Sequence, residues 1–235
     1  MSIGECIELD ERLIEASKDY KYLLSRGYSQ KISLNTICSR YMLSKLERSL
    51  LMRCIHRPDY VSKANIKKVS VEEIKQKTLV VDLLNTLSTL TTAISGGCVY
   101  LCDDGLIRDL GGSKKVSIDN LYVARAIDLI IKIFRELDVL EVIYVIDKNV
   151  SYSLDLGKYV VNKSRETGLL SSYLLAEKAD RSIIDLSRNN IVVTTDFVII
   201  DNVEKIFDLV NYVINKGFID KDSFKLIDLS AINFR

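Results

Sequence analysis

The sequence predicts an α/β protein, in which a parallel sheet with helices on both faces follows a small helical module. From Thr78 onward, short β-branched apolar runs alternate with stretches of helical apolar spacing. This alternation is typical of parallel strands joined by right-handed crossovers. Before Thr78 only helical spacing is found. We therefore place a basic helical module and linker at residues 1–70 and an α/β domain at residues 71–235.

Composition narrows the class of protein. With 235 residues, 48% of them apolar, the chain can bury a full core. Its apolar runs are broken by charges well short of a membrane span, and no signal-peptide pattern is found, so we expect a cytoplasmic protein with no membrane partner. The cysteines form no zinc-binding pattern, and we expect Cys98 and Cys102 to be small buried hydrophobic residues rather than a redox pair.

Charge is distributed unevenly along the chain. Between Tyr20 and Ser70, eleven Lys and Arg residues stand against two acids, a balance of +9, whereas the whole chain carries +1. A basic segment beside an acidic domain indicates that a polyanion binds the basic part.

The N-terminal segment predicts three helices, at about residues 7–26, after Ser29, and from Ser44 to Ile55, with Pro58 ending the third. The last two resemble a helix-turn-helix. Their basic side chains either contact nucleic acid or form a solvated face, and both interpretations stay open. The candidate nucleic-acid contacts are Arg40, Lys45, Arg48 and Arg53.

Residues 62–77 are polar and basic and are expected to form a linker that ends in a short helix. Beyond it we expect a hairpin at 98–107, inserted after the first crossover. The predicted strands are 79–82, 142–147, 170–176, 191–196 and a possible edge strand at 224–229, and the predicted helices are 87–94, 118–137, 154–166, 180–188 and 202–216.

Three of the predicted strands end in an aspartate, namely Asp82, Asp147 and Asp196. The carboxyl ends of parallel strands lie at one edge of a sheet, where ligands bind. Converging carboxylates are what hard divalent cations require. Each aspartate has the alternative role of a helix cap, but three in equivalent places favour a metal or phosphate site. Asn85 follows Asp82 by three residues and faces the same crevice.

Other residues could complete such a site. Asp180 is a fourth candidate ligand, and Asp109 either adds a ligand or forms a structural ion pair beside Arg108. After Asp147, Lys148 and Ser151 are candidate phosphate contacts.

These motifs resemble known families. The spacing Asp82-x-x-Asn85, Asp147 after a strand, and Thr195-Asp196 after another are similar to the acidic signature of PIN-like nuclease domains, especially the NYN type. Further motifs resemble an uncharacterised archaeal family whose N-terminal segment is domain of unknown function 434, fused to a PIN-like domain. They include Arg26-Gly27-Tyr28-Ser29, Arg40-Tyr41-x-Leu43-Ser44, Ser95-Gly96-Gly97 and Asp104-Gly105-Leu106-x-Arg108-Asp109. The resemblance spans about residues 7–216 and implies a metal-dependent ribonuclease fold in a cytoplasmic archaeal protein.

We therefore expect a Mg- or Mn-dependent endoribonuclease with RNA as its partner, DNA being possible for a helix-turn-helix. Asp82, Asp147 and Asp196, with Asp180 or Asp109, would hold the cation, and Asn85 would orient water or substrate. A haloacid-dehalogenase-type phosphatase is excluded, because Leu84 stands where its second aspartate is needed. The alternative is a catalytically silent RNA- or ribosome-binding protein whose acids merely cap helices.

Overall fold

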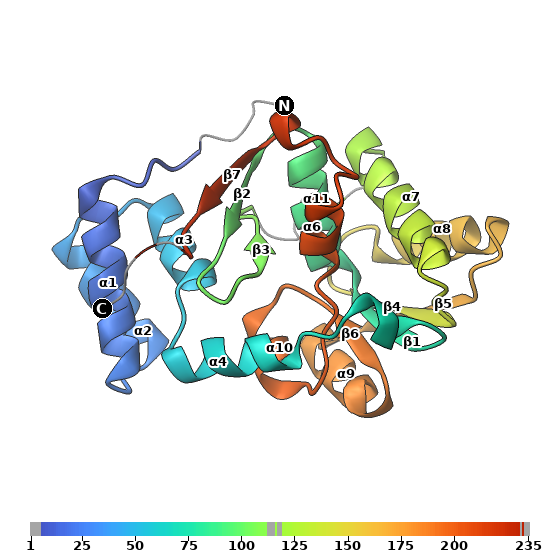
Figure 1. The fold of residues 1–235 in the computed structure, drawn as a ribbon, viewed down its shortest axis with the longest axis horizontal. Helices are drawn as coiled ribbons and strands as arrows, with labels where there is room; N and C mark the ends of the chain where they lie inside the picture. The colour runs from blue at the N-terminus through green and yellow to red at the C-terminus, as the bar shows by residue number, and fades with distance from the viewer. Residues whose placement is uncertain (1–5, 112–115, 117–118, 231, 233–235) are drawn as a thin grey trace.

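The structure is a computed structural model that describes residues 6–111, 116, 119–230 and 232. Its elements lie in three consecutive parts along the long axis (Figure 1). The N-terminal helices form one end, a small sheet lies in the middle, and a larger sheet with its helices forms the other end. No helix within the described ranges is both long and apolar enough to span a bilayer.

Four helices make up the N-terminal part: α1 (Glu11–Ser25), α2 (Gln30–Arg40), α3 (Lys45–Cys54) and α4 (Pro58–Lys67). The first three were expected. Helix α2 is capped by the side chain of Ser29, and α3 begins with the expected capping box between Ser44 and Glu47.

The third predicted helix ends before Pro58 as expected, and the short helix expected at the end of the linker is present, but the prediction of a linker was wrong for residues 62–67. Helix α4 begins at Pro58 and runs to Lys67. Proline is favoured at the first helical position, because its fixed φ suits the helix and its missing N–H has no partner there. Only the short helix α5 (Val71–Ile74) follows before the first strand.

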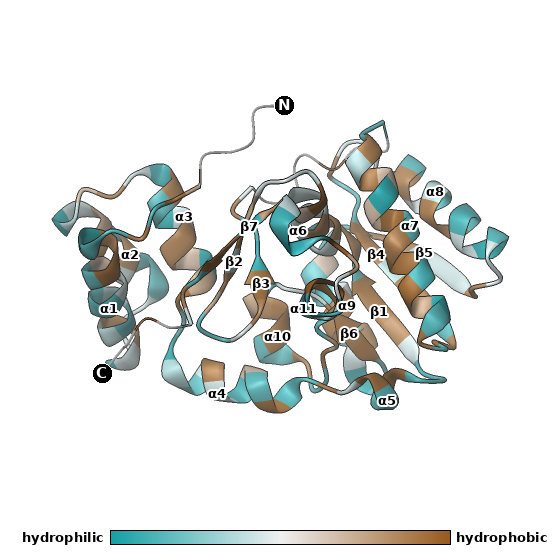
Figure 2. Ribbon diagram, turned by 45° about the horizontal axis from the view of Figure 1, so that its top comes forward, coloured by the Kyte–Doolittle hydropathy of each residue, from teal (hydrophilic) through white to brown (hydrophobic). Residues whose placement is uncertain are grey.

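The larger sheet is parallel, which confirms the α/β prediction. Its strands are β1 (Thr78–Asp82), β4 (Glu141–Asp147), β5 (Ser171–Ala176) and β6 (Ile191–Val193), in the order β5-β4-β1-β6. The central strand β1 has Leu79, Val80 and Val81 fully buried. Figure 2 shows hydrophobic colour along β1, β4 and β6 and a paler β5, the strand at one edge.

Helices cover both faces of this sheet. One face packs against α6 (Leu83–Ile94), α7 (Leu121–Glu136), α8 (Ser153–Glu166) and α11 (Leu209–Asn215). The other packs against α4, α9 (Ala179–Leu186) and α10 (Phe197–Asn202). The side chains of β1 alternate between the two cores, with Leu79 and Val81 on the first and Val80 on the second.

A single helix over residues 202–216 was predicted, and this was wrong. The chain forms α10 and α11 with an extended stretch between them. Ile206, in that stretch, makes parallel bridges with Lys68 and Val192. Its backbone is used to extend the sheet, so the helix cannot run through it.

The small sheet has the order β3-β2-β7, with β2 (Cys98–Leu101), β3 (Ile107–Arg108) and β7 (Lys225–Asp228). Strands β2 and β3 form the expected hairpin, while β7 pairs parallel to β2. The two faces of β2 serve different cores. Cys98 and Tyr100 face the N-terminal helices, and Val99 faces the core of the larger sheet. The small sheet thus joins the two larger parts.

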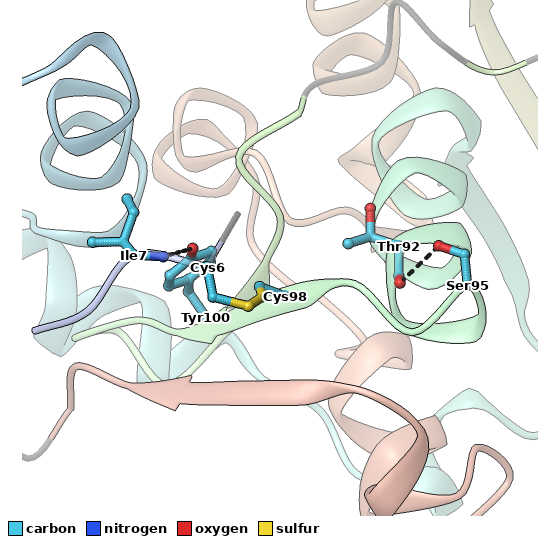
Figure 3. The surroundings of a disulfide bond; sticks show 6 residues. All are labelled: Cys6, Ile7, Thr92, Ser95, Cys98 and Tyr100. Atoms are coloured by element: carbon cyan, nitrogen blue, oxygen red, sulfur yellow. Dashed lines mark hydrogen bonds between the residues drawn. A yellow bond between two sulfur atoms is a disulfide. The ribbon is translucent and has the colours of Figure 1, made fainter. Parts of the chain in front are cut away.

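A disulfide between Cys6 and Cys98 fastens the start of the described chain to β2 (Figure 3). Beside it, the backbone N–H of Ile7 donates a hydrogen bond to Tyr100 Oη at 3.3 Å. The expectation of an unbonded cysteine was therefore wrong for Cys98, whereas Cys102 is free and buried as expected. The two bonded residues are 92 positions apart, a separation at which spacing predicts no pairing.

Candidate acidic site at the carboxyl edge of the sheet

Four aspartates lie along the carboxyl edge of the larger sheet, at or just beyond the ends of its four strands. Asp82 ends β1 and pairs in register with Val145, so Asp147, the last residue of β4, lies two positions further on. The prediction that Asp196 ends a strand was wrong: β6 stops at Val193, because Thr194 and Thr195 form a loop that leads to Asp196 at the N-cap of α10. Asp180 lies in the first turn of α9, after β5. The topology therefore brings together the acids that the sequence singled out, at the edge where parallel sheets bind ligands.

Asp82 is the buried member of the group, with 5% of its surface exposed. Its Oδ2 accepts hydrogen bonds from Asn85 Nδ2 at 2.8 Å and from Thr194 Oγ1 at 2.7 Å. Burial raises the pKa of Asp82 to about 6, and the negative charge of Asp196 adds to that rise. Asp82 therefore links β1 to the loop after β6 through a carboxylate that is costly to ionise.

Asp196 performs the capping role that was its alternative interpretation. Its Oδ1 accepts from the backbone N–H of Val198 at 2.7 Å and of Ile199 at 3.3 Å, at the start of α10. Its own N–H donates to Thr194 Oγ1 at 3.0 Å. Within the described residues Oδ2 receives no hydrogen bond, so capping occupies one oxygen and leaves the other available to a ligand.

Asp147 likewise uses one carboxylate oxygen for the structure of its own loop and leaves the other without a donor among the described residues. Its Oδ1 accepts from both the backbone N–H and the side-chain amide of Asn149, at 2.8 and 3.0 Å, which shapes the loop after β4. In the described chain its Oδ2 has no such donor. Asp180 is the most exposed of the four acids, but its carboxyl group is partly shielded from solvent. This partial burial raises its pKa, and the charges of Asp196 and Asp147 add to the rise. These acids therefore lie close enough to repel one another.

The four aspartates are spread along the edge rather than clustered at one point. Across the described ranges, the group that brings three possible ligand atoms within 4.8 Å of one another is a different one, His56, Asp103 and Asp104. That group is already occupied by cations of the protein itself. Asp103 accepts from Lys21 Nζ at 2.8 Å, and Asp104 holds Arg108 in two hydrogen bonds of 2.6 and 2.8 Å. It is therefore an ion-pair network and not a metal site.

Comparison with known proteins places the chain in a family. Residues 71–212, more than half of the chain, match the domain of unknown function DUF5616. The chain belongs to the DUF5616 family. Residues 12–67 match the protein family of unknown function DUF434. An uncharacterised protein of Methanocaldococcus jannaschii, MJ0935, is 31% identical over 201 residues, covering 83% of this chain and 93% of the relative. No solved structure matches the chain.

These matches confirm the DUF434 segment and an archaeal relative, as the N-terminal motifs predicted. The PIN-like assignment of the DUF5616 domain stays a prediction, as does the domain boundary near residue 70.

Within the DUF5616 domain, Asp109 contacts helix α6 and its own loop. It is buried and accepts from Ser88 Oγ at 3.0 Å, Thr89 Oγ1 at 3.1 Å and the N–H of Gly111 at 2.8 Å. Its described contacts thus hold its own loop against α6. Lys148 and Ser151 are exposed in the loop after Asp147, and Lys148 forms an ion pair with Glu177.

In the DUF434 segment, the four predicted basic contacts differ in exposure. Arg40 is exposed, lies over the ring of Tyr41 and pairs with Asp19 at 3.6 Å, and Lys45 is exposed at the start of α3. Arg48 is half-buried and donates to Asn35 of α2 at 3.0 Å. Arg53 is half-buried too, with its Nε inaccessible and unbonded. Two of the four candidate contacts, Arg48 and Arg53, are therefore partly buried, and Arg48 joins α3 to α2.

The sequence reasoning missed the buried polar network around Arg108. Arg108 is 2% exposed, and its Nε donates to the carbonyl oxygen of Thr195 at 2.6 Å. Asp104 also accepts from Tyr60 Oη at 3.1 Å. The Asp104-Gly105 turn was recognised in the sequence, but a polar pair four residues apart across a turn carries no signal of being buried.

Proposed function

We propose that this protein is a divalent-metal-dependent endoribonuclease whose site is the carboxyl edge of the larger sheet. Asp82, Asp147 and Asp196 serve as ligands of Mg²⁺ or Mn²⁺, and Asp180 is the fourth acid within reach. The observation that carries the proposal is that four acids lie along one edge of the sheet, at or just beyond the ends of its four strands, with the pKa values of Asp82 and Asp180 raised. Such perturbed carboxylates are commonest at functional sites.

The residues fit such a cation. Mg²⁺ usually keeps several waters and is held by one or two carboxylates together with substrate phosphates, so it does not need a tight cage of three acids. Asp147 and Asp196 each keep an oxygen that no described donor occupies, while their other oxygens fix the loops. When bound, the cation supplies an activated water and stabilises the leaving oxygen.

The protein's own groups then orient the reaction. Asn85 donates to Asp82 and holds that carboxylate in place. Lys148 and Ser151, exposed beside Asp147, are placed to contact a phosphate. Exposure rises from buried Asp82 to exposed Asp180, so a polymer can approach this edge from solvent.

RNA is the proposed polyanion, and the DUF434 helices supply basic contacts away from the acids. Phosphate contacts release counterions, so binding weakens with salt in proportion to their number. We expect the double variant Arg40→Ala/Lys45→Ala, which removes the two exposed members of the four candidate contacts, to weaken RNA binding and reduce the salt slope by up to about 2. The matched control is Lys132→Ala/Lys163→Ala on α7 and α8. If the salt slope of RNA binding is equal for the two double variants, Arg40 and Lys45 do not contact RNA and only form a solvated face.

The second candidate is a catalytically silent RNA- or ribosome-binding protein. It is favoured by the capping of α10 by Asp196 and by the turn that Asp147 forms with Asn149, because both acids then have a structural reason to be present.

One experiment separates the two functions. Single-stranded and structured RNA are incubated with Mn²⁺ and the wild-type protein, the Asp147→Asn variant or the control Asp185→Asn, an exposed acid on α9. We expect cleavage to fall at least about 100-fold in Asp147→Asn, as when a transition-state contact is removed, and to persist in the control. A wild-type protein that neither cleaves nor gains thermal stability from Mn²⁺ would support the silent binder.

A further inference from the structure

A fully buried arginine connects the small sheet to the loop that carries Asp196. Arg108 is on β3, and its guanidinium makes three hydrogen bonds. Nη1 and Nη2 donate to the two carboxylate oxygens of Asp104, at 2.8 and 2.6 Å. Nε donates to the carbonyl oxygen of Thr195 at 2.6 Å. Burying an ion pair costs solvation free energy, and replacing such a pair by apolar groups is often neutral for stability. A contribution to fold stability therefore does not by itself explain why Arg108 and Asp104 are buried as a pair.

The loop that Arg108 holds is anchored at three consecutive residues. Thr194 donates its hydroxyl proton to Asp82, Thr195 accepts from Arg108, and Asp196 caps α10. The arginine therefore holds the backbone between the two residues that meet the acidic edge. No other described side chain hydrogen-bonds to the Thr195 carbonyl.

Further hydrogen bonds hold Asp104, the partner of Arg108, in place. Asp104 accepts from Tyr60 Oη at 3.1 Å, and its backbone oxygen accepts from Lys68 Nζ at 2.8 Å. The ring of Phe197, next to Asp196, lies 5.6 Å from the ring of His56 and 6.2 Å from that of Tyr60. His56 and Tyr60, on either side of Pro58, thus lie against the residue that follows the loop.

The position of the Thr194–Asp196 loop sets where two of the carboxylates lie. The hydroxyl of Thr194 donates to Asp82 at 2.7 Å, and the loop carries Asp196 to the start of α10. A site that binds a cation needs its ligands held in place before the cation arrives.

We propose that Arg108 is a positioning residue, which together with Asp104 fixes the Thr194–Asp196 loop so that Asp82 and Asp196 are held ready for a divalent cation. The inference rests on the proposed function, since it gives a role in cation binding to a network that touches no substrate.

Arginine is suited to this role and lysine is not. The guanidinium is planar and presents Nε and the two Nη groups in fixed directions, so it can hold a carboxylate and a carbonyl at once. A lysine at position 108 has one ammonium group and can satisfy Asp104 or Thr195, but not both in the same geometry.

The test uses the full chain and Mn²⁺ alone, without RNA. Arg108→Lys keeps the charge and loses the fixed fork. Asp104→Leu/Arg108→Met removes both charges together and so avoids an unpaired buried ion. The control is Tyr144→Phe, which removes a buried hydrogen bond to Ser164 on the same sheet, away from the loop. Folding is followed by circular dichroism and melting temperature, and Mn²⁺ affinity by calorimetric titration.

We expect Mn²⁺ affinity to fall about 10- to 100-fold in the double variant, the loss typical of removing a group that orients a ligand. Arg108→Lys should lie between the double variant and the wild type, and Tyr144→Phe should bind as the wild type does. If the wild type binds Mn²⁺ and both variants fold and bind it with the same affinity, the positioning role is overturned while the proposed function stays intact. A wild-type protein that binds no Mn²⁺ would overturn both.

Discussion

Replacing Asp82 by asparagine should make the metal-free protein more stable. The pKa of Asp82 is raised to about 6, chiefly because burial disfavours its charged form. A carboxyl group in the unfolded chain titrates near 3.9, so ionising Asp82 in the folded protein costs about 3 kcal/mol of the free energy of unfolding. Asparagine carries no charge, and its carbonyl oxygen can still accept from Asn85 and Thr194.

The sign of the pH dependence follows from the direction of this shift. Below about pH 4 the carboxyl group is protonated in both states and costs nothing. Between about pH 4 and 6 the folded protein holds a proton that the unfolded chain has released, so stability falls as pH rises, and above about pH 6 the full cost applies. Asp82→Asn should therefore exceed the wild type by up to about 3 kcal/mol at pH 7.5 and match it near pH 4.

Urea unfolding followed by circular dichroism, at four values between pH 4 and 7.5 and with a chelator present, measures this difference. Asp185→Asn, an exposed acid paired with Arg181, controls for the loss of one negative charge. In a second series without chelator, added Mn²⁺ should stabilise the wild type and not Asp82→Asn. A difference that does not change with pH, or a variant less stable than the wild type at pH 7.5, would refute the reasoning.

Three further predictions concern the scaffold. Thiol titration of the denatured protein should find three free thiols without reductant and five with it, and reducing Cys6–Cys98, which closes a 92-residue loop, should lower the free energy of unfolding by up to about 4–5 kcal/mol; five thiols from the start would exclude the bond. Gly157→Ala places a Cβ 2.6 Å from the ring of Tyr173, so urea unfolding should show a net loss of about 1–2 kcal/mol, and a gain would mean that the ring moves freely. Ser44→Ala removes the cap of α3 and should lower stability by about 1 kcal/mol in the same assay, whereas no change would show the cap to be redundant.

The larger sheet could be predicted because its strands are buried on both faces. A strand of this kind reads as a continuous run such as Leu79-Val80-Val81, and the polar residue that ends the run marks the sheet edge. The positions of Asp82 and Asp147 at that edge follow from the same local pattern, whereas Asp196 lies beyond the end of β6, after Thr194 and Thr195.

Features that depend on distant residues could not be read in this way. The break between α10 and α11 is imposed by the bridges of Ile206 to Val192 and Lys68, and local apolar spacing continues through it. The contact between Arg108 and Thr195 joins residues 87 positions apart. Polar pairs show no periodicity, so the part of the site that holds the loop is invisible in the sequence although the acids themselves are not.

The pairing of β7 with β2 has a consequence for the order in which the chain folds. Helices α1–α3 bury their apolar faces against a sheet whose outer strand comes from residues 225–228 and whose core includes Ile227 and Leu229. During synthesis these helices emerge before residues 225–229, so the surface on which they pack is complete only after those residues have been made. Contacts so distant in sequence form slowly, and the apolar side chains that wait for them are exposed to aggregation meanwhile. Helices α1–α3 are thus synthesised well before the surface on which they pack is complete.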